Sequence, residues 1–459
     1  MEQDKILQNI REELFYGATD YTKNQPDLFV PHRFRMLAPS QVNQYLQKLE
    51  QGLPEKEILI YVHLPFCFSE CLFCNSFPLP ADASLQNDYL RGLLKEIDLM
   101  AASGIFAGKK ARCIYFGGGT PTLFPNSALE SILDRIRAAI PPAEGCSITT
   151  EAHPATVASR ERIAGLAKAG VNRISMGCQT FDPELLVLCN RSNSEELIKQ
   201  VVDYAHDAGI RVNIDMMAGL PGQTLRSLAN DLAALERIRP DAVEYIRHEI
   251  VNPLVVDLYK KRPELVVSDD TLFEMVLTAQ RWMKSSGYEQ NGSYTSDRQW
   301  AYRYYWLQEM PIIAFGLRTR SYATTLCYDK HEDLPTYLRM IEKGIPPIGR
   351  HIVLTKREQM FRTFMLQIQL ARGLDIGGFR SRYFEEPFGL FRGLFTKLEK
   401  LGCLETSADS AKLTECGAWF VEDVCDCIID EALKEDSGGA VRIPHSEGSR
   451  SARLGVCRT

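Results

Sequence analysis

The chain has 459 residues, of which 45% are hydrophobic and 24% are charged, and its formal net charge is −6. This length and composition indicate an ordinary globular protein of two or three domains. The mildly negative charge argues against a nucleic-acid-binding protein, because such proteins carry a basic surface. The first residues are charged, and no window reaches the roughly 20 apolar residues that span a bilayer, so we expect a cytoplasmic protein without a transmembrane segment.

Short runs rich in Ile, Val, Tyr and Thr alternate with helical patterns along most of the chain. A helical pattern over 38–53 comes first, and it falls in a predicted N-terminal extension, residues 1–55. The predicted strands follow at 58–65, 111–119, 146–154, 172–181, 211–222 and 242–250. The segments between them, such as 84–102 and 194–209, have helical periodicity and capping residues. This alternation predicts βα units and a parallel sheet.

Unusual residues stand where these predicted strands end. His63, the run Gly117 to Gly119, Glu151, Gln179 and Asp215 each close one strand. Because the chemistry of parallel α/β folds lies at the carboxyl edge of the strands, we expect these residues to face one rim of the sheet.

Thirteen cysteines are scattered along the chain, and a chain of this size needs no disulfides, so we expect most to be free thiols. Only Cys67, Cys71 and Cys74 are clustered with ligand-like spacing, C-x3-C-x2-C. The other closely spaced pair, Cys425 and Cys427, falls in a helical pattern and is interpreted as core or surface thiols rather than as ligands.

Three clustered thiolates fit some metal sites better than others. A structural zinc site needs four ligands and a redox pair needs two, so each leaves the triplet unexplained. An iron–sulfur cluster of four irons, ordinarily held by four thiolates, would keep one iron open for a substrate or cofactor. We favour this last interpretation, with zinc binding or redox use as alternatives.

Five motifs in order complete the pattern. They are CFSECLFC at 67–74, YFGGGTPTLF at 115–124, TTEAHP at 149–154, NRISMGCQTF at 172–181 and NIDMMAGLPGQT at 213–224. Together they resemble the radical S-adenosylmethionine (SAM) enzymes of the oxygen-independent coproporphyrinogen III oxidase-like (HemN/HemW) family. The resemblance implies an α/β fold, with a partial (β/α)6 barrel over 56–330 and a small, mostly helical HemN-type C-terminal domain over 331–435. We expect the Ser-, Gly- and Arg-rich tail, 436–459, to be disordered.

The same resemblance implies a set of cofactors and ligands. Cys67, Cys71 and Cys74 would hold a 4Fe-4S cluster, and a low-potential donor of flavodoxin or ferredoxin type would reduce it. One molecule of SAM, or two, would bind at the rim. The matching SAM positions are Tyr61, Gly118, Gly119, Thr120, Glu151, Gln179, Arg191 and Asp215. We interpret His63, His153 and the turn at 219–224 as structural, and no catalytic residue is assigned.

The resemblance leaves the reaction open between three classes. One is methyl transfer from a second SAM to an sp2 carbon of a planar acceptor, a quinone such as menaquinone or an aromatic heterocycle. The second is anaerobic tetrapyrrole chemistry, which is coproporphyrinogen III oxidation or haem degradation. The third is a HemW-like haem chaperone.

Departures of this sequence from the family pattern weaken two of these three function classes. Asn75 and Ser76 replace the Gly-Cys of the coproporphyrinogen enzymes, and the segment 188–193 keeps Arg191 without the histidine of the haem chaperones. We therefore predict methyl transfer, with the aromatic stretch at 287–306 either lining the pocket for a planar substrate or packing in the core.

Overall fold

The computed structural model describes residues 2–15, 34–51, 53–76, 78–248, 250, 252–288 and 301–436. The predicted tail after residue 436 and positions 289–300 of the aromatic stretch lie outside these ranges.

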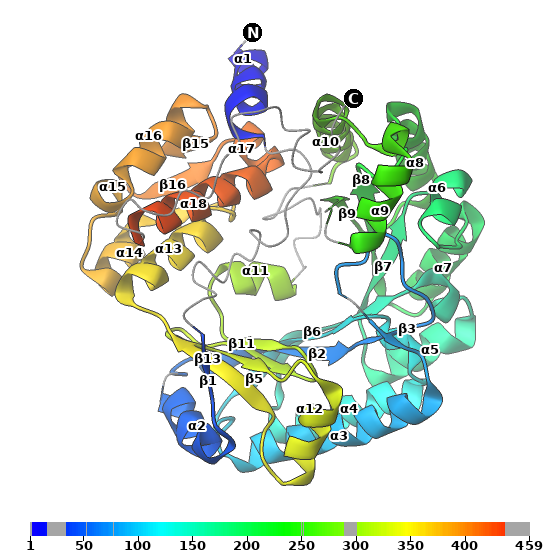
Figure 1. Ribbon diagram of the computed structural model, residues 1–459, viewed down its shortest axis with the longest axis vertical. Helices are drawn as coiled ribbons and strands as arrows, with labels where there is room; N and C mark the ends of the chain where they lie inside the picture. Colours follow the sequence, from blue (N-terminus) through cyan, green and yellow to red (C-terminus); the bar gives the residue numbers. More distant parts are fainter. Residues whose placement is uncertain are drawn as a thin grey trace.

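A single sheet of eleven strands forms the centre of the molecule, in the order β1-β13-β12-β11-β10-β2-β5-β6-β7-β8-β9. Its parallel part runs from β10 to β9. These seven strands are β10 (Ile312–Phe315), β2 (Glu57–Leu64), β5 (Lys110–Gly118), β6 (Pro142–Ala152), β7 (Arg173–Gln179), β8 (Arg211–Ala218) and β9 (Ala242–Arg247). Within the described ranges β9 and β1 are the two free edges, so the curved sheet is a partial barrel, as predicted (Figure 1).

Four antiparallel strands extend the sheet beyond β10. They are β11 (Arg320–Tyr322), β12 (Leu326–Lys330), β13 (Ile348–Val353) and β1 (Arg35–Met36). β13 thus belongs to the large sheet although it lies beyond the domain boundary predicted at residue 330. The predicted boundaries themselves stay predictions.

Helices follow the parallel strands and cover the outer face of the sheet (Figure 1). The main ones are α3 (Ala83–Ala102), α4 (Asn126–Ala139), α5 (Arg160–Ala169), α7 (Glu195–Asp207), α8 (Leu225–Ile238) and α10 (Asp269–Ser285). Five of these six begin at a side-chain cap, in which an Asp, Ser or Thr oxygen accepts a backbone N–H of the first turn. The short helices α6 (Pro183–Leu188) and α9 (Pro253–Lys261) follow β7 and β9 along the chain.

The C-terminal part is mostly helical, as predicted. It contains α12 (Leu334–Glu342), α13 (Lys356–Gln367), α14 (Ile376–Tyr383), α15 (Pro387–Leu390), α16 (Arg392–Lys400), α17 (Glu415–Trp419) and α18 (Val421–Asp436). A three-stranded sheet of β14 (Leu374–Asp375), β16 (Ser410–Leu413) and β15 (Leu404–Thr406) stands between them. Arg247 of β9, only 3% exposed, donates to Glu422 and Asp423 of α18, so a buried ion network ties this part to the barrel.

The N-terminal extension is also helical where it is described. It consists of α1 (Glu2–Asn9), a π-helical turn (Ile10–Leu14), a 3-10 turn (Pro39–Gln41) and α2 (Val42–Gln51). Buried side chains of both helical segments, including Ile10, Leu14 and Leu46, join the main hydrophobic core.

The twelve cysteines in the described ranges are all free thiols. Cys425 and Cys427 are buried in α18, which confirms their interpretation as ordinary core thiols. Over the same ranges no helix is long and apolar enough to cross a membrane.

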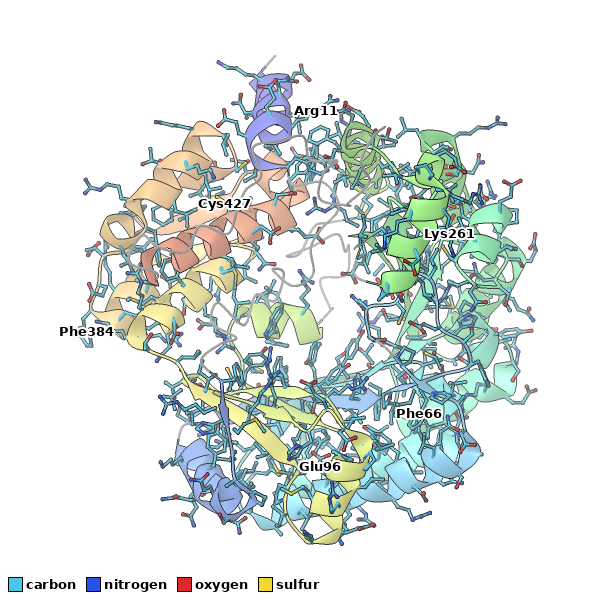
Figure 2. All side chains as sticks on the ribbon, in the orientation of Figure 1. Arg11, Phe66, Glu96, Lys261, Phe384 and Cys427 are labelled. Carbon is cyan, nitrogen blue, oxygen red and sulfur yellow. The ribbon has the colours of Figure 1, made fainter. Side chains whose placement is uncertain are left out.

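A buried ion pair joins α3 to the antiparallel strands. Glu96 of α3 and Lys330 of β12 are both fully buried and bind each other. Glu96 also accepts the backbone N–H of Gly316 at 2.9 Å and the hydroxyl of Tyr337. In Figure 2, Glu96 lies beside α12. A buried charge is tolerated only when it is paired, so each partner depends on the other.

We expect Lys330→Met to lower the free energy of unfolding by about 3–5 kcal/mol, because it leaves the Glu96 carboxylate buried without its counter-charge. The double variant Glu96→Gln, Lys330→Met should recover part of this loss, since the glutamine is neutral and its oxygen can still accept from Gly316. Urea denaturation of the three chains measures the difference. A double variant no more stable than the single one would contradict this account.

Candidate functional site

The three clustered cysteines lie on the loop that follows β2. Cys67 ends the short strand β3 (Phe66–Cys67), which pairs in parallel with β4 (Leu79–Pro80) and so closes the loop at its base. Cys74 donates its backbone N–H to the carbonyl of Cys71 at 3.0 Å, which forms a tight turn between the second and third cysteines. All three residues are half-buried. The three thiols therefore belong to one compact loop at the carboxyl end of the first barrel strand.

Two asparagines from other parts of the chain hold this loop. Asn252 is 1% exposed, and its side-chain amide donates to the carbonyl of Cys74 at 3.2 Å and to the carboxylate of Glu70 at 3.0 Å. Asn190 donates to the carbonyl of Glu70 at 2.9 Å. Sequence reasoning missed both residues. The Asn-Pro pair at 252–253 signals a helix N-cap, which Asn252 is, but the contact with the cysteine loop has no local sequence pattern.

The glycine run at the end of β5 packs against the end of β2. A Cβ on Gly119 would lie 2.5 Å from the carbonyl oxygen of Phe66, and one on Gly118 would lie 2.7 Å from the ring of His63. Gly118 also has a φ of 117°, which favours glycine. Gly119 donates to the Leu64 carbonyl at 3.0 Å, as a ladder bond would. The atoms that require these glycines therefore belong to the protein itself (Figure 2 labels Phe66).

Thr120 completes the contact between these two strand ends. Its backbone N–H donates to the carbonyl of Phe66 at 2.8 Å, and its hydroxyl oxygen lies 3.4 Å from the sulfur of Cys67. Burial, as the main cause, raises the pKa of the Cys67 thiol to about 11. A ligand that draws this thiol into the thiolate form must therefore offset the cost of a buried charge, which a cationic metal centre does.

Glu151, at the end of β6, points toward the same rim. Its carboxylate accepts the hydroxyl of Tyr115 at 3.0 Å and the backbone N–H of Gly118 at 3.1 Å. Burial raises the pKa of Glu151 to about 7. Tyr61 of β2 stacks on Tyr115 of β5, with ring centroids 6.1 Å apart. These two rings therefore lie beside the Glu151 carboxylate, which Tyr115 contacts.

Gln179 and Arg191 each present a buried polar atom to the site. Gln179 ends β7 with a φ of 74°, unusual for a residue other than glycine. Arg191 donates to the sulfur of Cys71 at 3.3 Å and to the carbonyl of Gly177. The amide oxygen of Gln179 and the Nε of Arg191 are buried and have no hydrogen-bond partner among the described residues. Because such atoms are costly when unsatisfied, they fit the binding of a polar ligand beside the cysteine loop.

Asp215 lies on β8, next to β7 in the sheet, and is held by its neighbours. Its carboxylate accepts the Ser175 hydroxyl at 3.3 Å and the side-chain amide of Asn213. Burial is the main cause that raises the pKa of Asp215, and the charge of Arg173 opposes it. Asp215 is therefore part of a buried polar cluster inside the barrel.

This polar cluster contains residues that sequence reasoning missed. Arg173 is fully buried, and Glu244 of β9 has its pKa raised to about 7, with burial as the first cause and the charge of Asp215 as the second. Tyr115, which binds Glu151, was missed as well. The alternation along β7 could have indicated a polar face inside the barrel. Arg173, Ser175 and Gly177 alternate there with apolar residues, and alternate residues of a strand share one face.

His63, His153 and the turn at 219–224 each make local hydrogen bonds, and their structural role stays an interpretation. His63 accepts or donates at Nδ1 to the Tyr61 hydroxyl at 3.1 Å, and burial lowers its pKa to about 4. His153 caps a short 3-10 turn by accepting the N–H of Ala155 at 3.2 Å. In the turn 219–224, the Gln223 side chain accepts the N–H groups of its own loop at 2.7 and 3.1 Å.

The described part of the aromatic stretch divides between the site and the core. Tyr302 of α11 (Ala301–Leu307) has its ring 5.1 Å from Tyr115 and 6.5 Å from Tyr61, so it faces the site. Tyr305 and Trp306 pack against the hydrophobic core. Core packing therefore holds for Tyr305 and Trp306. A role of the stretch in lining a pocket for a planar substrate stays a prediction.

Within the described part of the chain, no group of three or more His, Cys, Asp or Glu side chains is placed to hold a single metal ion. A 4Fe-4S cluster binds each thiolate through a different iron. The cluster, zinc binding and redox use at the cysteine loop all stay predictions.

We expect the buried carboxylate of Glu151 to make stability depend on pH. Its pKa of about 7 in the folded chain exceeds the ordinary 4.5, so the folded state holds the proton more tightly. Its contribution is complete below the unfolded pKa and is lost as pH rises through about 7. Glu151→Gln should therefore reduce the fall in the free energy of unfolding over this interval, measured by urea denaturation of the cofactor-free chain. Equal slopes in variant and parent would show that Glu151 does not titrate there.

Comparison with family models gives two matches. Residues 61–235 match the model of the radical SAM superfamily, and residues 354–420 match the model of the HemN C-terminal domain. The first covers the cysteine loop and the strand ends from β2 to β8, and the second covers the helices and small sheet of the C-terminal part.

Several curated relatives are named either heme chaperone HemW or oxygen-independent coproporphyrinogen III oxidase. The heme chaperone HemW of Escherichia coli is 33% identical over 234 residues, or 50% of this chain and 60% of the relative. HemW of Bacillus subtilis is 27% identical over 382 residues, or 81% of this chain and 99% of the relative. The oxygen-independent coproporphyrinogen III oxidase of Paracoccus denitrificans is 35% identical over 189 residues, 40% of this chain and 41% of the relative. The chain thus spans 60% of the length of the HemW relatives from E. coli and Haemophilus influenzae.

A solved structure matches over nearly the whole chain. Coproporphyrinogen III oxidase (HemN) from Escherichia coli aligns with a TM-score of 0.77 and 21% identity, and it covers 90% of this chain and 100% of the HemN chain. This likeness confirms the fold. Residues 61–235 therefore form a radical SAM domain, whose homologues bind a 4Fe-4S cluster and SAM, and residues 354–420 form a HemN C-terminal domain.

Proposed function

We propose that this chain holds a 4Fe-4S cluster through Cys67, Cys71 and Cys74, binds SAM beside it, and acts on a tetrapyrrole. The observation that carries the proposal is the meeting of the cysteine loop with Arg191, which binds Cys71 and still has a buried, unsatisfied Nε. When bound and reduced, the cluster supplies the electron that cleaves SAM to a 5′-deoxyadenosyl radical.

The chain's own residues bind and orient SAM in this proposal. Arg191 has the planar fork that suits a carboxylate. Glu151 offers a carboxylate to the cationic or hydroxyl groups of SAM, with Gly118, Gly119 and Thr120 beside it. Gln179 supplies an unsatisfied amide oxygen. Tyr61 of β2 and Asp215 of β8 complete the proposed SAM site.

The names of the relatives support a tetrapyrrole as the substrate class. HemW is named a heme chaperone, and the Paracoccus denitrificans relative is named an oxygen-independent coproporphyrinogen III oxidase. Methyl transfer to a planar acceptor, the class that the sequence favoured, has no support from these names. It stays a prediction that rests on Asn75, Ser76 and the missing histidine near Arg191. The flavodoxin- or ferredoxin-type donor also stays a prediction.

We expect alanine at Cys67, Cys71 or Cys74 to abolish SAM cleavage. The full chain would be reconstituted anaerobically with iron and sulfide, reduced, and incubated with methyl-deuterated SAM and either haem or coproporphyrinogen III. Iron content, 5′-deoxyadenosine, S-adenosylhomocysteine and the tetrapyrrole products are measured. Each variant should lose the cluster and 5′-deoxyadenosine, whereas Cys146→Ala, which changes a half-buried cysteine of β6, should keep both.

The products distinguish the candidate functions. A tetrapyrrole consumed together with 5′-deoxyadenosine formation supports a catalytic tetrapyrrole protein. Tight haem binding without turnover supports a chaperone. S-adenosylhomocysteine with deuterium in a product would instead establish methyl transfer. If each of the three single alanine variants keeps its cluster, the proposed ligands are wrong.

We expect Asn252→Ala to lower the iron content per chain, because Asn252 holds the Cys74 carbonyl and the Glu70 carboxylate. This change also removes the N-cap of α9, which costs about 1 kcal/mol. Ser268→Ala removes the N-cap of α10 without touching the cysteine loop and is the matched control. Equal iron content in the two variants would show that Asn252 does not position the loop.

A further inference from the structure

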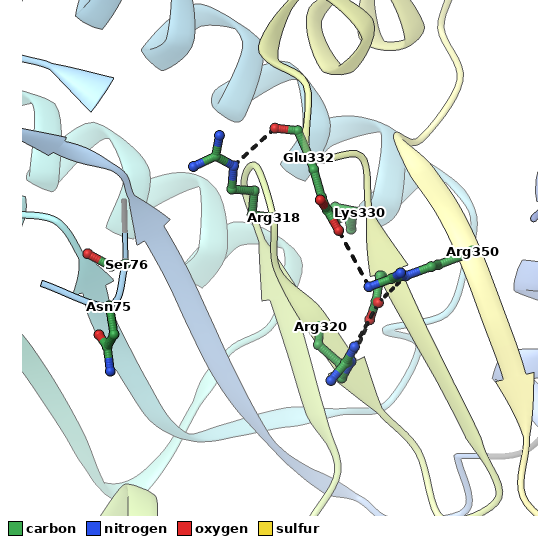
Figure 3. A pocket seen from close by; sticks show the side chains of 8 residues that line it. Asn75, Ser76, Arg318, Arg320, Lys330, Glu332 and Arg350 are labelled. Carbon is green, nitrogen blue, oxygen red and sulfur yellow. Dashed lines mark hydrogen bonds and ion pairs between the residues drawn. The ribbon is translucent and has the colours of Figure 1, made fainter. Parts of the chain in front are cut away.

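A pocket of about 520 Å³ lies between the cysteine loop and the antiparallel strands. Its lining residues are Asn75, Ser76, Arg318, Arg320, Asp329, Lys330, Glu332 and Arg350. Figure 3 shows Asn75 and Ser76 on one side and the arginines on the other. The volume lies in the range of small-molecule sites. The SAM-binding residues proposed above do not line this pocket.

The pocket carries an excess of positive charge. Among the described residues that line it, three are arginines and one is a lysine, against the carboxylates of Asp329 and Glu332. The ammonium of Lys330 is neutralised by Glu96 behind the sheet. The three arginines therefore outnumber the two carboxylates of the pocket, and the balance favours an anionic ligand.

Asp329 orients two of these arginines. Arg320 donates to its two carboxylate oxygens at 2.5 and 2.8 Å, and Arg350 donates to it at 2.6 Å. Arg350 also lies 3.4 Å from the Glu332 carboxylate. Because a guanidinium has five N–H donors in a planar fork, one fixed in this way is pre-organised to bind a second carboxylate.

Arg318 is presented by a turn that the core holds in place. Its φ is 60°, in the left-handed region that residues other than glycine rarely adopt. In the same turn, Gly316 donates to Glu96 at 2.9 Å and Leu317 donates to the Tyr89 hydroxyl at 3.0 Å. Backbone held in such a conformation by its surroundings is often found at functional sites.

The pocket adjoins the cysteine loop. Asn75 and Ser76 directly follow Cys74, and the Ser76 hydroxyl lies 3.2 Å from the Cys74 sulfur. On the opposite side, a Cβ on Gly316 would lie 2.8 Å from the carbonyl of His63, at the end of β2. The pocket therefore borders the cysteine loop at Asn75 and Ser76 and the turn that bears Arg318.

We infer that Arg318, Arg320 and Arg350 bind carboxylate groups of the substrate and so place its ring system beside the cysteine loop. This inference rests on the proposed function, because tetrapyrroles carry several carboxylate side chains. The methionyl end of SAM has the same chemistry, so the experiment must separate the two sources.

The test compares mesoporphyrin IX with its dimethyl ester, which differs only in having no free carboxylates. Binding to the reconstituted full chain is followed by porphyrin fluorescence, and SAM binding by equilibrium dialysis. The variants are Arg318→Gln, Arg350→Gln and the charge-conserving Arg318→Lys. The control is Arg160→Gln, which changes an exposed arginine paired with Asp207 on the outer helices.

We expect the parent chain to bind the diacid at least about tenfold more tightly than the diester, the effect of one charge-assisted hydrogen-bonded pair. Arg318→Gln and Arg350→Gln should each lose most of this preference. Arg318→Lys should keep part of it, and Arg160→Gln should keep all of it. Diester binding and SAM binding should change little in every variant.

Other outcomes overturn the inference, and they show whether the arginine assignment alone or the tetrapyrrole function itself is wrong. A parent chain that prefers the diacid, with arginine variants that keep the preference, rejects these residues while leaving the proposed function intact. Variants that lose SAM binding instead identify SAM as the source of the carboxylate and reject the substrate assignment. A parent chain that cleaves SAM but binds neither porphyrin rejects the tetrapyrrole function and this inference with it.

Discussion

The candidate site depends on one close backbone contact, between the glycine run of β5 and the residues that follow β2. Gly119 approaches Phe66 so closely that any side chain would collide with the main chain, and Gly119 and Thr120 donate to the carbonyls of Leu64 and Phe66. These bonds continue the sheet for two residues beyond the regular strands. The chain that leaves β2 is thereby held against β5 before it turns into the cysteine loop, so the thiols reach the same rim as the Glu151 carboxylate.

Buried charged side chains gather on neighbouring strands of the barrel. The charge of Arg173 on β7 acts on the carboxylates of Asp215 on β8 and Glu244 on β9, and burial raises the pKa of both groups and of Glu151 on β6. Such an arrangement opposes folding, because buried ionised groups are costly unless they are paired. Clusters of perturbed carboxylates in one cavity are typical of functional sites. The apolar core between the sheet and its outer helices supplies stabilisation against this cost.

The buried Glu96 connects the fold to both sites. It neutralises Lys330 on β12 and fixes Gly316 in the turn that presents Arg318. Tyr89 lies on the same face of α3, two turns before Glu96. Its hydroxyl donates to the carbonyl of His63 at 2.8 Å and accepts the backbone N–H of Leu317. One helix therefore holds both the end of β2, which leads to the cysteines, and the turn that leads to the arginine pocket. A shift of α3 would move both together.

The sequence by itself determined the parallel barrel, the triplet of thiols and most of the rim, because these features are local. The spacing of Cys67, Cys71 and Cys74, the glycine run and the polar residues at strand ends each lie in a short segment with its own pattern. Contacts between distant segments were decided by the tertiary structure alone. Asn252 meets Cys74 across 178 positions, and Lys330 meets Glu96 across 234. The arginine pocket likewise draws on the cysteine loop and on β11 to β13. The physical reason is that a side chain's partner is fixed by how strands and helices pack, and that packing has no periodicity to be detected along the chain.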